Sequence, residues 1–137
     1  MHITMPPFSR VIHIMRERIT LKNYDNTQIK NIAIAGHAGS GKTTLTETLL
    51  YAAGVTDRLG KVADGTTVSD YTAEEKKRQY SIKTSVIPVE YAGCKLNVLD
   101  NPGYFDFAAE VVQSLRVADA GLICLSAKSG IVVGTEK

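Results

Sequence analysis

The segment at residues 36–43, GHAGSGKT, constrains the fold of this chain more than any other feature of the sequence. It matches the pattern G-x-x-x-x-G-K-[ST] and falls between two segments of different hydrophobic period. Residues 29–36 are a short apolar run that ends in glycine, which is typical of a strand buried on both faces. From Thr43, apolar residues recur at helical spacing as far as Gly54, which is suited to end a helix in the left-handed conformation. The apolar residues that recur at this spacing are Leu45, Leu49, Leu50 and Ala53.

A loop of this composition between a strand and a helix is suited to bind phosphate groups. Its glycines let backbone N–H groups turn toward the phosphates, and the helix N-terminus adds the positive end of its dipole. Lys42 is predicted to contact the β- and γ-phosphates, and the Thr43 hydroxyl to coordinate Mg²⁺. A glycine-rich turn without a ligand would not require Lys-Thr after the last glycine. The predicted nucleotide-binding residues of this loop are Gly36, His37, Ala38, Gly39, Ser40, Gly41, Lys42, Thr43 and Thr44.

The rest of the chain continues the alternation of strands and helices. Residues 82–91 and 95–99 flank a tight turn and predict an antiparallel hairpin, while residues 106–117 predict a helix and residues 122–125 a further apolar strand. The order βαββαβ predicts an α/β fold with helices on both faces of a mostly parallel sheet that has one antiparallel edge strand. Residues 55–81 show no sustained period, and we interpret this long segment as a nucleotide-dependent switch.

A second nucleotide signature follows the predicted hairpin. Its second strand ends in Asp100, and Asn101-Pro102-Gly103 comes next. A carboxylate at this strand end would lie beside the phosphate loop and hold Mg²⁺ through water, while the N–H of Gly103 could approach a γ-phosphate. Asp-Asn-Pro-Gly is also a favourable turn sequence on its own. The phosphate loop upstream favours the nucleotide interpretation.

Composition and charge exclude several classes of protein. The chain has 137 residues, 44% hydrophobic and 22% charged, which fits one folded domain. It has no run of 18 apolar residues, so no transmembrane span is predicted. Cys94 and Cys124 form no CxxC motif, which argues against zinc and disulfides and fits a reducing cytoplasm. The net charge of +2 gives no strongly basic surface, so we expect no direct sequence-specific contact with nucleic acid.

Residues 1–28 are expected to form an N-terminal extension, and residues 29–137 the nucleotide-binding part. The extension contains Arg10, Arg16 and Arg18, and Glu17 is its only acid before residue 25. Segments rich in arginine and poor in acids are typical of mitochondrial transit peptides, which leaves that alternative open.

From about Tyr24 to its last residue, the chain resembles the N-terminal part of the GTP-binding domain of the translational GTPases, specifically of elongation factor G and its paralogues. Residues 65–70, GTTVSD, and 74–82, EEKKRQYSI, resemble the first switch of that family, and residues 100–107, DNPGYFDF, resemble the second. The resemblance implies a P-loop NTPase fold, GTP and Mg²⁺ as cofactors, GTP hydrolysis, and the ribosome as the partner of the full-length protein.

The resemblance also implies roles for individual residues. Ser81 takes the position of a switch threonine that senses the γ-phosphate through Mg²⁺, although it could also be only the polar first residue of a strand. Tyr104 takes the position of a histidine that positions the attacking water. A phenol, whose ordinary pKa is about 10, can orient water but is a poor proton acceptor at neutral pH. The predicted metal ligands are therefore Thr43, Ser81 and Asp100, and the predicted catalytic residues Tyr104 and Lys42.

The guanine-reading motif N-K-x-D does not occur before Lys137. We therefore expect the C-terminal part of the domain, and any later domains, to lie outside this chain. Residues 126–128, SAK, superficially match a later guanine-binding loop of the family. We interpret them as a strand-end loop. Three alternatives stay open: a P-loop ATPase or small-molecule kinase, because the loop reads phosphates and not bases; a module that holds nucleotide with little turnover, because of Tyr104; and a chain that by itself binds nucleotide poorly.

Overall fold

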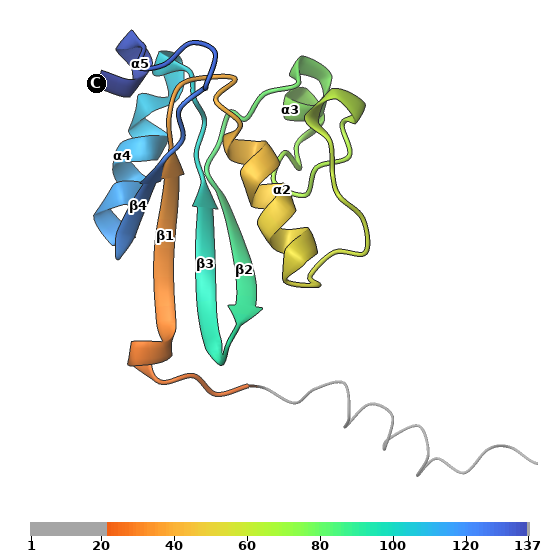
Figure 1. The fold of residues 1–137 in the computed structure, drawn as a ribbon, viewed down its shortest axis with the longest axis vertical. Coiled ribbons are helices and arrows are strands. Elements are labelled where there is room, and N and C mark those ends of the chain that lie inside the picture. The colour runs from red at the N-terminus through yellow and green to blue at the C-terminus, as the bar shows by residue number, and fades with distance from the viewer. Residues whose placement is uncertain (1–21, 137) are drawn as a thin grey trace, which may run out of the picture.

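The computed structural model describes residues 22–136, and four of its strands form one sheet in the order β2-β3-β1-β4 (Figure 1). Strand β1 pairs in parallel with both β3 and β4, while β2 pairs with β3 in the antiparallel direction. The predicted sheet, mostly parallel with one antiparallel edge strand, is confirmed. The strands are β1 Ile29–Ala35, β2 Ser85–Tyr91, β3 Cys94–Asp100 and β4 Ala120–Ile123.

Helices lie on both sides of this sheet (Figure 1). The connection that carries α2 leads from β1 toward β3, and the connection that carries α4 leads from β3 back past β1 to β4. Because such crossovers are right-handed, two that run in opposite directions place their helices on opposite faces. The predicted order βαββαβ is confirmed for the four strands with α2 and α4, and the short helices α3 and α5 are additional. The helices are α2 Lys42–Ala52, α3 Ala73–Arg78, α4 Ala108–Val117 and α5 Val133–Glu136, with short 3-10 turns η1 Asn26–Gln28, η2 Val62–Asp64 and η3 Phe105–Phe107.

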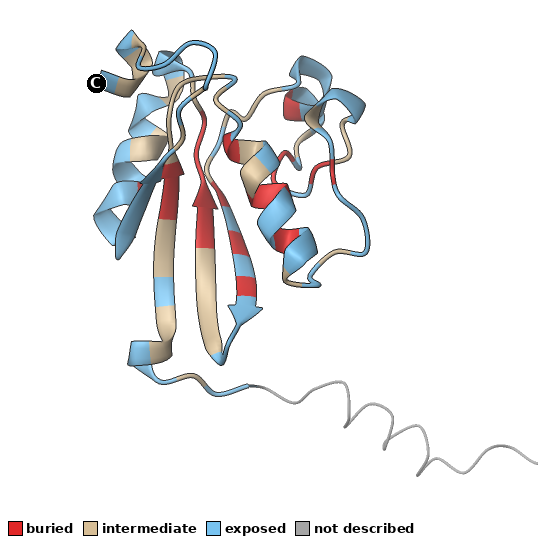
Figure 2. Cartoon of the chain, viewed as in Figure 1, coloured by how far each residue is buried: buried red, intermediate tan, exposed pale blue. Residues whose placement is uncertain are grey.

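The hydrophobic core lies between α2 and the sheet. Strand β2 alternates as expected for a strand with one covered face, since Ile87 and Val89 are buried while Val86 is exposed. Ile87 and Val89 pack with Ile34, Leu50 and Val98 in one cluster. Figure 2 shows the buried residues concentrated on α2, on β2 and on the ends of β1 and β3 that lead into the loops. The best-packed part of the domain therefore supports the ends of β1 and β3 from which these loops begin.

The buried face of α2 is only partly apolar. Leu50 is fully buried, but Leu49 is 40% exposed, and the other buried positions include Thr46 and Glu47. Helix α2 packs against a polar loop segment as well as against the sheet. The carboxylate of Glu47 accepts hydrogen bonds from the backbone of that segment, at Val68.

Residues 55–81 contain more regular structure than the prediction allowed, namely η2 and α3. Helix α3 begins with a capping box, in which Thr72 Oγ1 accepts a hydrogen bond from Glu75 N, and the Glu75 carboxylate accepts one from Thr72 N. The helix ends at Gln79, whose φ of 59° is left-handed. Six residues are too few to show a hydrophobic period, but the T-x-x-E signature at residues 72–75 was a readable signal.

Strand β4 forms the second edge of the sheet, and all of its residues are exposed (Figure 2). The sequence predicted a continuous apolar strand here, yet Ile123 is 63% exposed.

Within residues 22–136, no helix is long and apolar enough to cross a membrane. Most of the predicted N-terminal extension, including the arginines that suggested a transit peptide, lies outside the described residues.

Candidate nucleotide-binding site

The phosphate loop connects β1 to α2 and leaves the N-terminus of α2 open. Gly41 is the N-cap residue and has a φ of 92°, a left-handed conformation that glycine adopts without steric cost. Among the described residues, no side chain caps this helix end. The first N–H groups of α2, and the positive end of its dipole, therefore remain available to an anion.

A cavity of about 320 Å³ lies at this helix end. Its wall comes from four segments: the phosphate loop, the first turn of α2, residues 62–81, and the loop that follows β3. The residues that line it are Ala38, Gly39, Gly41, Lys42, Thr43, Thr44, Val62, Asp70, Gln79, Tyr80, Ser81, Gly103 and Tyr104. Most of the predicted site residues are thus brought together in one cavity.

Four predicted residues, Gly36, His37, Ser40 and Asp100, do not line this cavity. His37 and Ser40 border a second cavity of about 150 Å³, together with Cys124 of the segment after β4. Gly36 also faces that segment, because a Cβ atom on it would lie 2.4 Å from the Cys124 carbonyl oxygen. The segment continues in a turn closed by a 2.8 Å hydrogen bond from N–H of residue 130 to the carbonyl of residue 126, which confirms the predicted strand-end loop.

Lys42 lies at the floor of the larger cavity. Its Nζ donates hydrogen bonds of 2.9 Å to the carbonyl oxygens of Gly36 and His37. Burial lowers the pKa of the Lys42 amine, and the nearby carboxylate of Asp100 opposes that shift. Gly103 closes over this amine so tightly that a Cβ atom there would lie 2.4 Å from Nζ. The second switch signature therefore contacts the phosphate loop at Gly103, a position that a larger residue could not occupy.

A chain of hydroxyls and carboxylates crosses one wall of the cavity. Thr43 Oγ1 lies 3.2 Å from Ser81 Oγ, and Ser81 Oγ donates a 2.7 Å hydrogen bond to Asp70 Oδ1. Asp70 is buried and also accepts a 3.3 Å hydrogen bond from Thr67. The sequence predicted Thr43 and Ser81 but assigned no role to Asp70, whose position beside them depends on the fold of residues 67–81.

Asp100 lies behind this wall and is 1% exposed. Among the described residues, neither of its carboxylate oxygens has a hydrogen-bond partner. Burial raises the pKa of Asp100 to about 6; the charge of Asp70 adds to the shift, and the nearby hydroxyls of Thr43 and Ser69 and the charge of Lys42 oppose it. A buried carboxylate without a partner beside two hydroxyls is an arrangement that a hard cation or its bound water would satisfy.

The part of the chain that the structure describes has no group of three or more His, Cys, Asp or Glu side chains that could hold a metal ion by itself. A cation at this wall would therefore depend on hydroxyl oxygens and on oxygens of its ligand. Mg²⁺ is commonly bound in this way, through one or two protein ligands together with substrate phosphates and water. The donor set of Thr43, Ser81 and Asp100 thus fits Mg²⁺ bound with a phosphate ligand.

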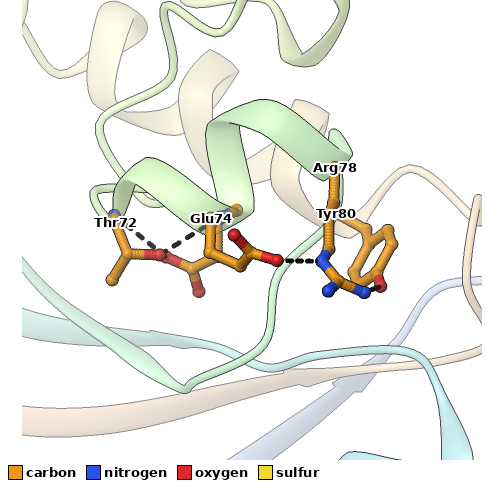
Figure 3. A network of polar contacts seen from close by, with 5 residues as sticks. Thr72, Glu74, Arg78 and Tyr80 are labelled. Atoms are coloured by element: carbon orange, nitrogen blue, oxygen red, sulfur yellow. Dashed lines mark hydrogen bonds and ion pairs between the residues drawn. The ribbon is translucent and has the colours of Figure 1, made fainter.

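Tyr104 lies at the mouth of the cavity, where its ring contacts that of Tyr80. Tyr80 is held from α3, because Arg78 Nη1 donates a 3.0 Å hydrogen bond to its hydroxyl oxygen and Arg78 also pairs with Glu74 (Figure 3). The sequence predicted Tyr104 at this site but gave no role to Tyr80. Tyr80 lies within the segment that resembles the first switch, but its contact with Tyr104 depends on the turn at Gln79.

The strand–loop–helix with its open helix N-terminus, buried lysine and hydroxyl wall defines a P-loop nucleotide-binding domain of the α/β class. More particularly, the chain belongs to the family of the elongation factor Tu GTP binding domain, whose model matches residues 27–137. The predicted resemblance to the translational GTPases is confirmed.

Several known proteins share this part of the chain. Elongation factor G 2 of Borreliella burgdorferi is 41% identical over 108 residues, which are 79% of this chain and 16% of the relative. The mitochondrial ribosome-releasing factor 2 of Danio rerio is 40% identical over 116 residues, 85% of this chain and 15% of the relative. A tetracycline resistance protein of Enterococcus faecalis is 43% identical over 108 residues, 79% of this chain and 17% of the relative. The chain therefore spans about a sixth of the length of these relatives.

Solved structures agree with this assignment. A protein from Thermus thermophilus superposes with a TM-score of 0.77 at 48% identity, over 81% of this chain and 17% of that protein. A bacterial selenocysteine-specific elongation factor superposes with a TM-score of 0.60 at 25% identity, over 78% of this chain and 16% of that protein.

Proposed function

We propose that residues 29–137 are the N-terminal portion of the GTP-binding domain of a longer, ribosome-acting GTPase of the elongation factor G type, and that residues 1–28 extend it. The observation that carries the proposal is the 3.2 Å approach of Thr43 to Ser81, which joins the phosphate loop to the first switch segment at the edge of the 320 Å³ cavity. The names of the relatives, an elongation factor G and a ribosome-releasing factor, support the ribosome as partner.

In this proposal the nucleotide phosphates occupy the cavity at the N-terminus of α2. Backbone N–H groups of the loop and of the first turn of α2 donate to the α- and β-phosphates. The Lys42 amine exchanges its carbonyl partners for β- and γ-phosphate oxygens, which restores full charge pairing to a buried cation. The N–H of Gly103, a residue that packs closely on Lys42, approaches the γ-phosphate.

Thr43, Ser81 and Asp100 would hold Mg²⁺ in this site. The ion, when bound, would neutralise charge that develops on the β- and γ-phosphate oxygens. The Thr43 and Ser81 hydroxyls supply oxygen ligands from two segments, so ligand binding would draw the first switch toward α2. The Asp100 carboxylate, without a partner among the described residues, would accept hydrogen bonds from bound water.

Tyr104 is placed to orient the attacking water, because it lines the cavity next to Gly103. A phenol donates and accepts a hydrogen bond but removes a proton poorly at neutral pH, so the proton of the water must pass to the γ-phosphate or to solvent. We therefore expect slow intrinsic hydrolysis that the ribosome accelerates.

The test is single-turnover hydrolysis of GTP and ATP by the longer protein, with and without ribosomes. Ribosome-stimulated hydrolysis of GTP and not of ATP is the expected result. GTP hydrolysis that ribosomes do not accelerate, or ATP hydrolysis at the same rate as GTP hydrolysis, would favour the ATPase or kinase alternative. Tight GTP binding without hydrolysis under either condition would favour the second candidate, a nucleotide-holding module, for which Tyr104 in place of histidine is the supporting observation.

For the compartment we propose the cytoplasm, on the ground that Cys94 and Cys124, among the described residues, are free thiols. The mitochondrial name of one relative keeps the transit-peptide alternative for residues 1–28 in view. Fluorescence microscopy of the full protein with a C-terminal tag, compared with a form that begins at Met15, separates the two compartments. A mitochondrial signal that is lost in the shorter form would contradict the cytoplasmic proposal.

A further inference from the structure

Glu47 is a fully buried carboxylate in the middle of α2, the helix that carries Lys42 and Thr43. Its Oε1 accepts hydrogen bonds from the backbone N–H groups of Val68, at 2.7 Å, and Ser69, at 3.2 Å. The next residue in the chain is Asp70, which accepts the hydrogen bond of the Ser81 hydroxyl. One carboxylate of α2 thus holds the two residues directly before Asp70.

Glu75 has the corresponding arrangement on the other side of Ser81. It is fully buried in α3, and its Oε1 accepts hydrogen bonds from the N–H groups of Ile82, at 3.0 Å, and Lys83, at 3.1 Å. Its Oε2 accepts from the N–H and the hydroxyl of Thr72. Although burial raises the pKa of Glu75, these hydrogen bonds outweigh burial and keep it below its usual value, so the group is ionised at neutral pH. The two N–H groups that Oε1 binds directly follow Ser81.

The two carboxylates are therefore placed at matching positions around the proposed cation wall. Buried carboxyl groups are costly unless they are hydrogen-bonded, and here each of the two accepts hydrogen bonds from a backbone pair adjacent to a wall residue. We propose that Glu47 and Glu75 are positioning residues that fix Asp70 and Ser81 for binding of Mg²⁺ with the nucleotide. This inference rests on the proposed function.

Gly60 provides an independent way to disturb the first of these contacts. A Cβ atom on Gly60 would lie 2.2 Å from Glu47 Oε2 and 2.9 Å from Thr67 Cα, so the glycine packs directly on the carboxylate and on the residue before the segment that it holds. Oε2 has no hydrogen-bond partner among the described residues. A glutamine at position 47 could therefore keep its oxygen on Val68 and Ser69 and place its amide where Oε2 now lies, whereas Gly60→Ala would displace an intact Glu47.

The experiment uses the longer protein and makes three measurements. They are the Mg²⁺ concentration at which GTP binding reaches half of its Mg²⁺-saturated level, the GTP affinity in EDTA, and the midpoint of thermal unfolding. The variants are Glu47→Ala, Glu75→Gln and Gly60→Ala. Glu47→Gln is the conservative variant, and Glu90→Gln is the matched control, since Glu90 is exposed and pairs with Lys22 away from the site. Glu75→Gln is expected to act because both of its oxygens accept hydrogen bonds, which an amide nitrogen cannot do.

We expect each of the three variants to raise the required Mg²⁺ concentration about tenfold, with affinity in EDTA within about twofold of wild type, because groups that orient ligands act on the metal and not on the phosphates. Glu47→Gln and Glu90→Gln should match wild type. If the variants change GTP affinity equally with Mg²⁺ and in EDTA, or change neither affinity, the proposal that Glu47 and Glu75 are positioning residues is wrong. Loss of folding in Glu47→Ala leaves Gly60→Ala and Glu75→Gln to decide. If wild type shows no Mg²⁺-dependent GTP binding, the proposed function itself fails, and the inference with it.

Discussion

Tyr80 and Tyr104 pack edge to face, with ring centroids 4.8 Å apart and ring planes at 62°. This geometry is favourable for aromatic pairs and contributes about 0.5–1.5 kcal/mol beyond the area that it buries. Because Tyr80 lies near the end of the first switch segment and Tyr104 lies in the second signature, the pair joins the two segments at the mouth of the cavity. Tyr104, whose hydroxyl we propose orients water, is thereby held against the first switch segment.

Tyr104→Phe should slow ribosome-stimulated GTP hydrolysis in the longer protein by roughly ten- to ten-thousand-fold, the range usual for a positioned acid–base group. The substitution removes the hydroxyl and keeps the ring contact with Tyr80, so GTP affinity should stay within a few-fold. Tyr104→His should retain activity, since imidazole also donates and accepts hydrogen bonds. Single-turnover rates for both variants provide the measurement.

Tyr91→Phe is the matched control for this prediction, because Tyr91 is an exposed tyrosine at the end of β2 and does not line the cavity. Its rate should equal that of wild type. If Tyr104→Phe also hydrolyses GTP at the wild-type rate, the hydroxyl has no catalytic role, and Tyr104 acts only by packing on Tyr80.

Lys42→Ala should weaken GTP binding at least tenfold. Charge-assisted hydrogen bonds to phosphate contribute on the order of 1.5–3 kcal/mol, and the structure already holds the amine at the floor of the cavity. Calorimetric titration of wild type and variant with Mg²⁺·GTP measures the loss. Lys30→Ala is the control, because Lys30 is an exposed residue at the start of β1. Equal affinities of wild type and Lys42→Ala would contradict the phosphate-loop assignment.

The core of the site could be predicted from the sequence because its signals are local. The phosphate loop needs only glycines, Lys42 and Thr43 in order, and the Asp100 signature follows a short strand at a fixed place after the hairpin. Asp70, Glu47 and Glu75 could not be assigned in this way, since each acts through residues that the fold brings near it. The Glu47 carboxylate is buried against the N–H groups of Val68 and Ser69, which are far from it in the sequence.

The 137-residue chain by itself should discriminate poorly between GTP and ATP. The motif N-K-x-D does not occur in its sequence, and the residues that line the cavity belong to the phosphate loop, α2 and the two switch segments. Affinities for Mg²⁺·GTP and Mg²⁺·ATP are therefore expected to agree within about tenfold, a difference of about 1.4 kcal/mol. Competition of each nucleotide against a fluorescent GTP analogue measures the ratio. A guanine preference of about a hundredfold or more in this chain would show that another of its segments reads the base.

Asp100→Asn should change how the stability of the nucleotide-free chain depends on pH. The folded state holds the pKa of Asp100 at about 6, above the ordinary value of 3.8, so between these values the folded chain binds more protons than the unfolded chain. The stabilising contribution is fully present below about pH 4 and is lost as pH rises through 6. The shift corresponds to at most about 3 kcal/mol, and asparagine, which does not titrate, removes it.

Urea unfolding from pH 4.5 to 7.5, in EDTA and without nucleotide, measures this difference. Relative to Asp100→Asn, the wild-type chain should lose stability as pH rises, whereas Asp57→Asn, at an exposed position in the loop after α2, should follow wild type. At pH 7 with Mg²⁺ and GTP, the wild-type chain should instead be more stable than Asp100→Asn. Only the ionised carboxylate can satisfy a cation or its bound water, and a ligand that binds the folded state stabilises it. Parallel pH profiles for wild type and Asp100→Asn would show that Asp100 is ionised throughout this range and that its burial does not oppose the charge.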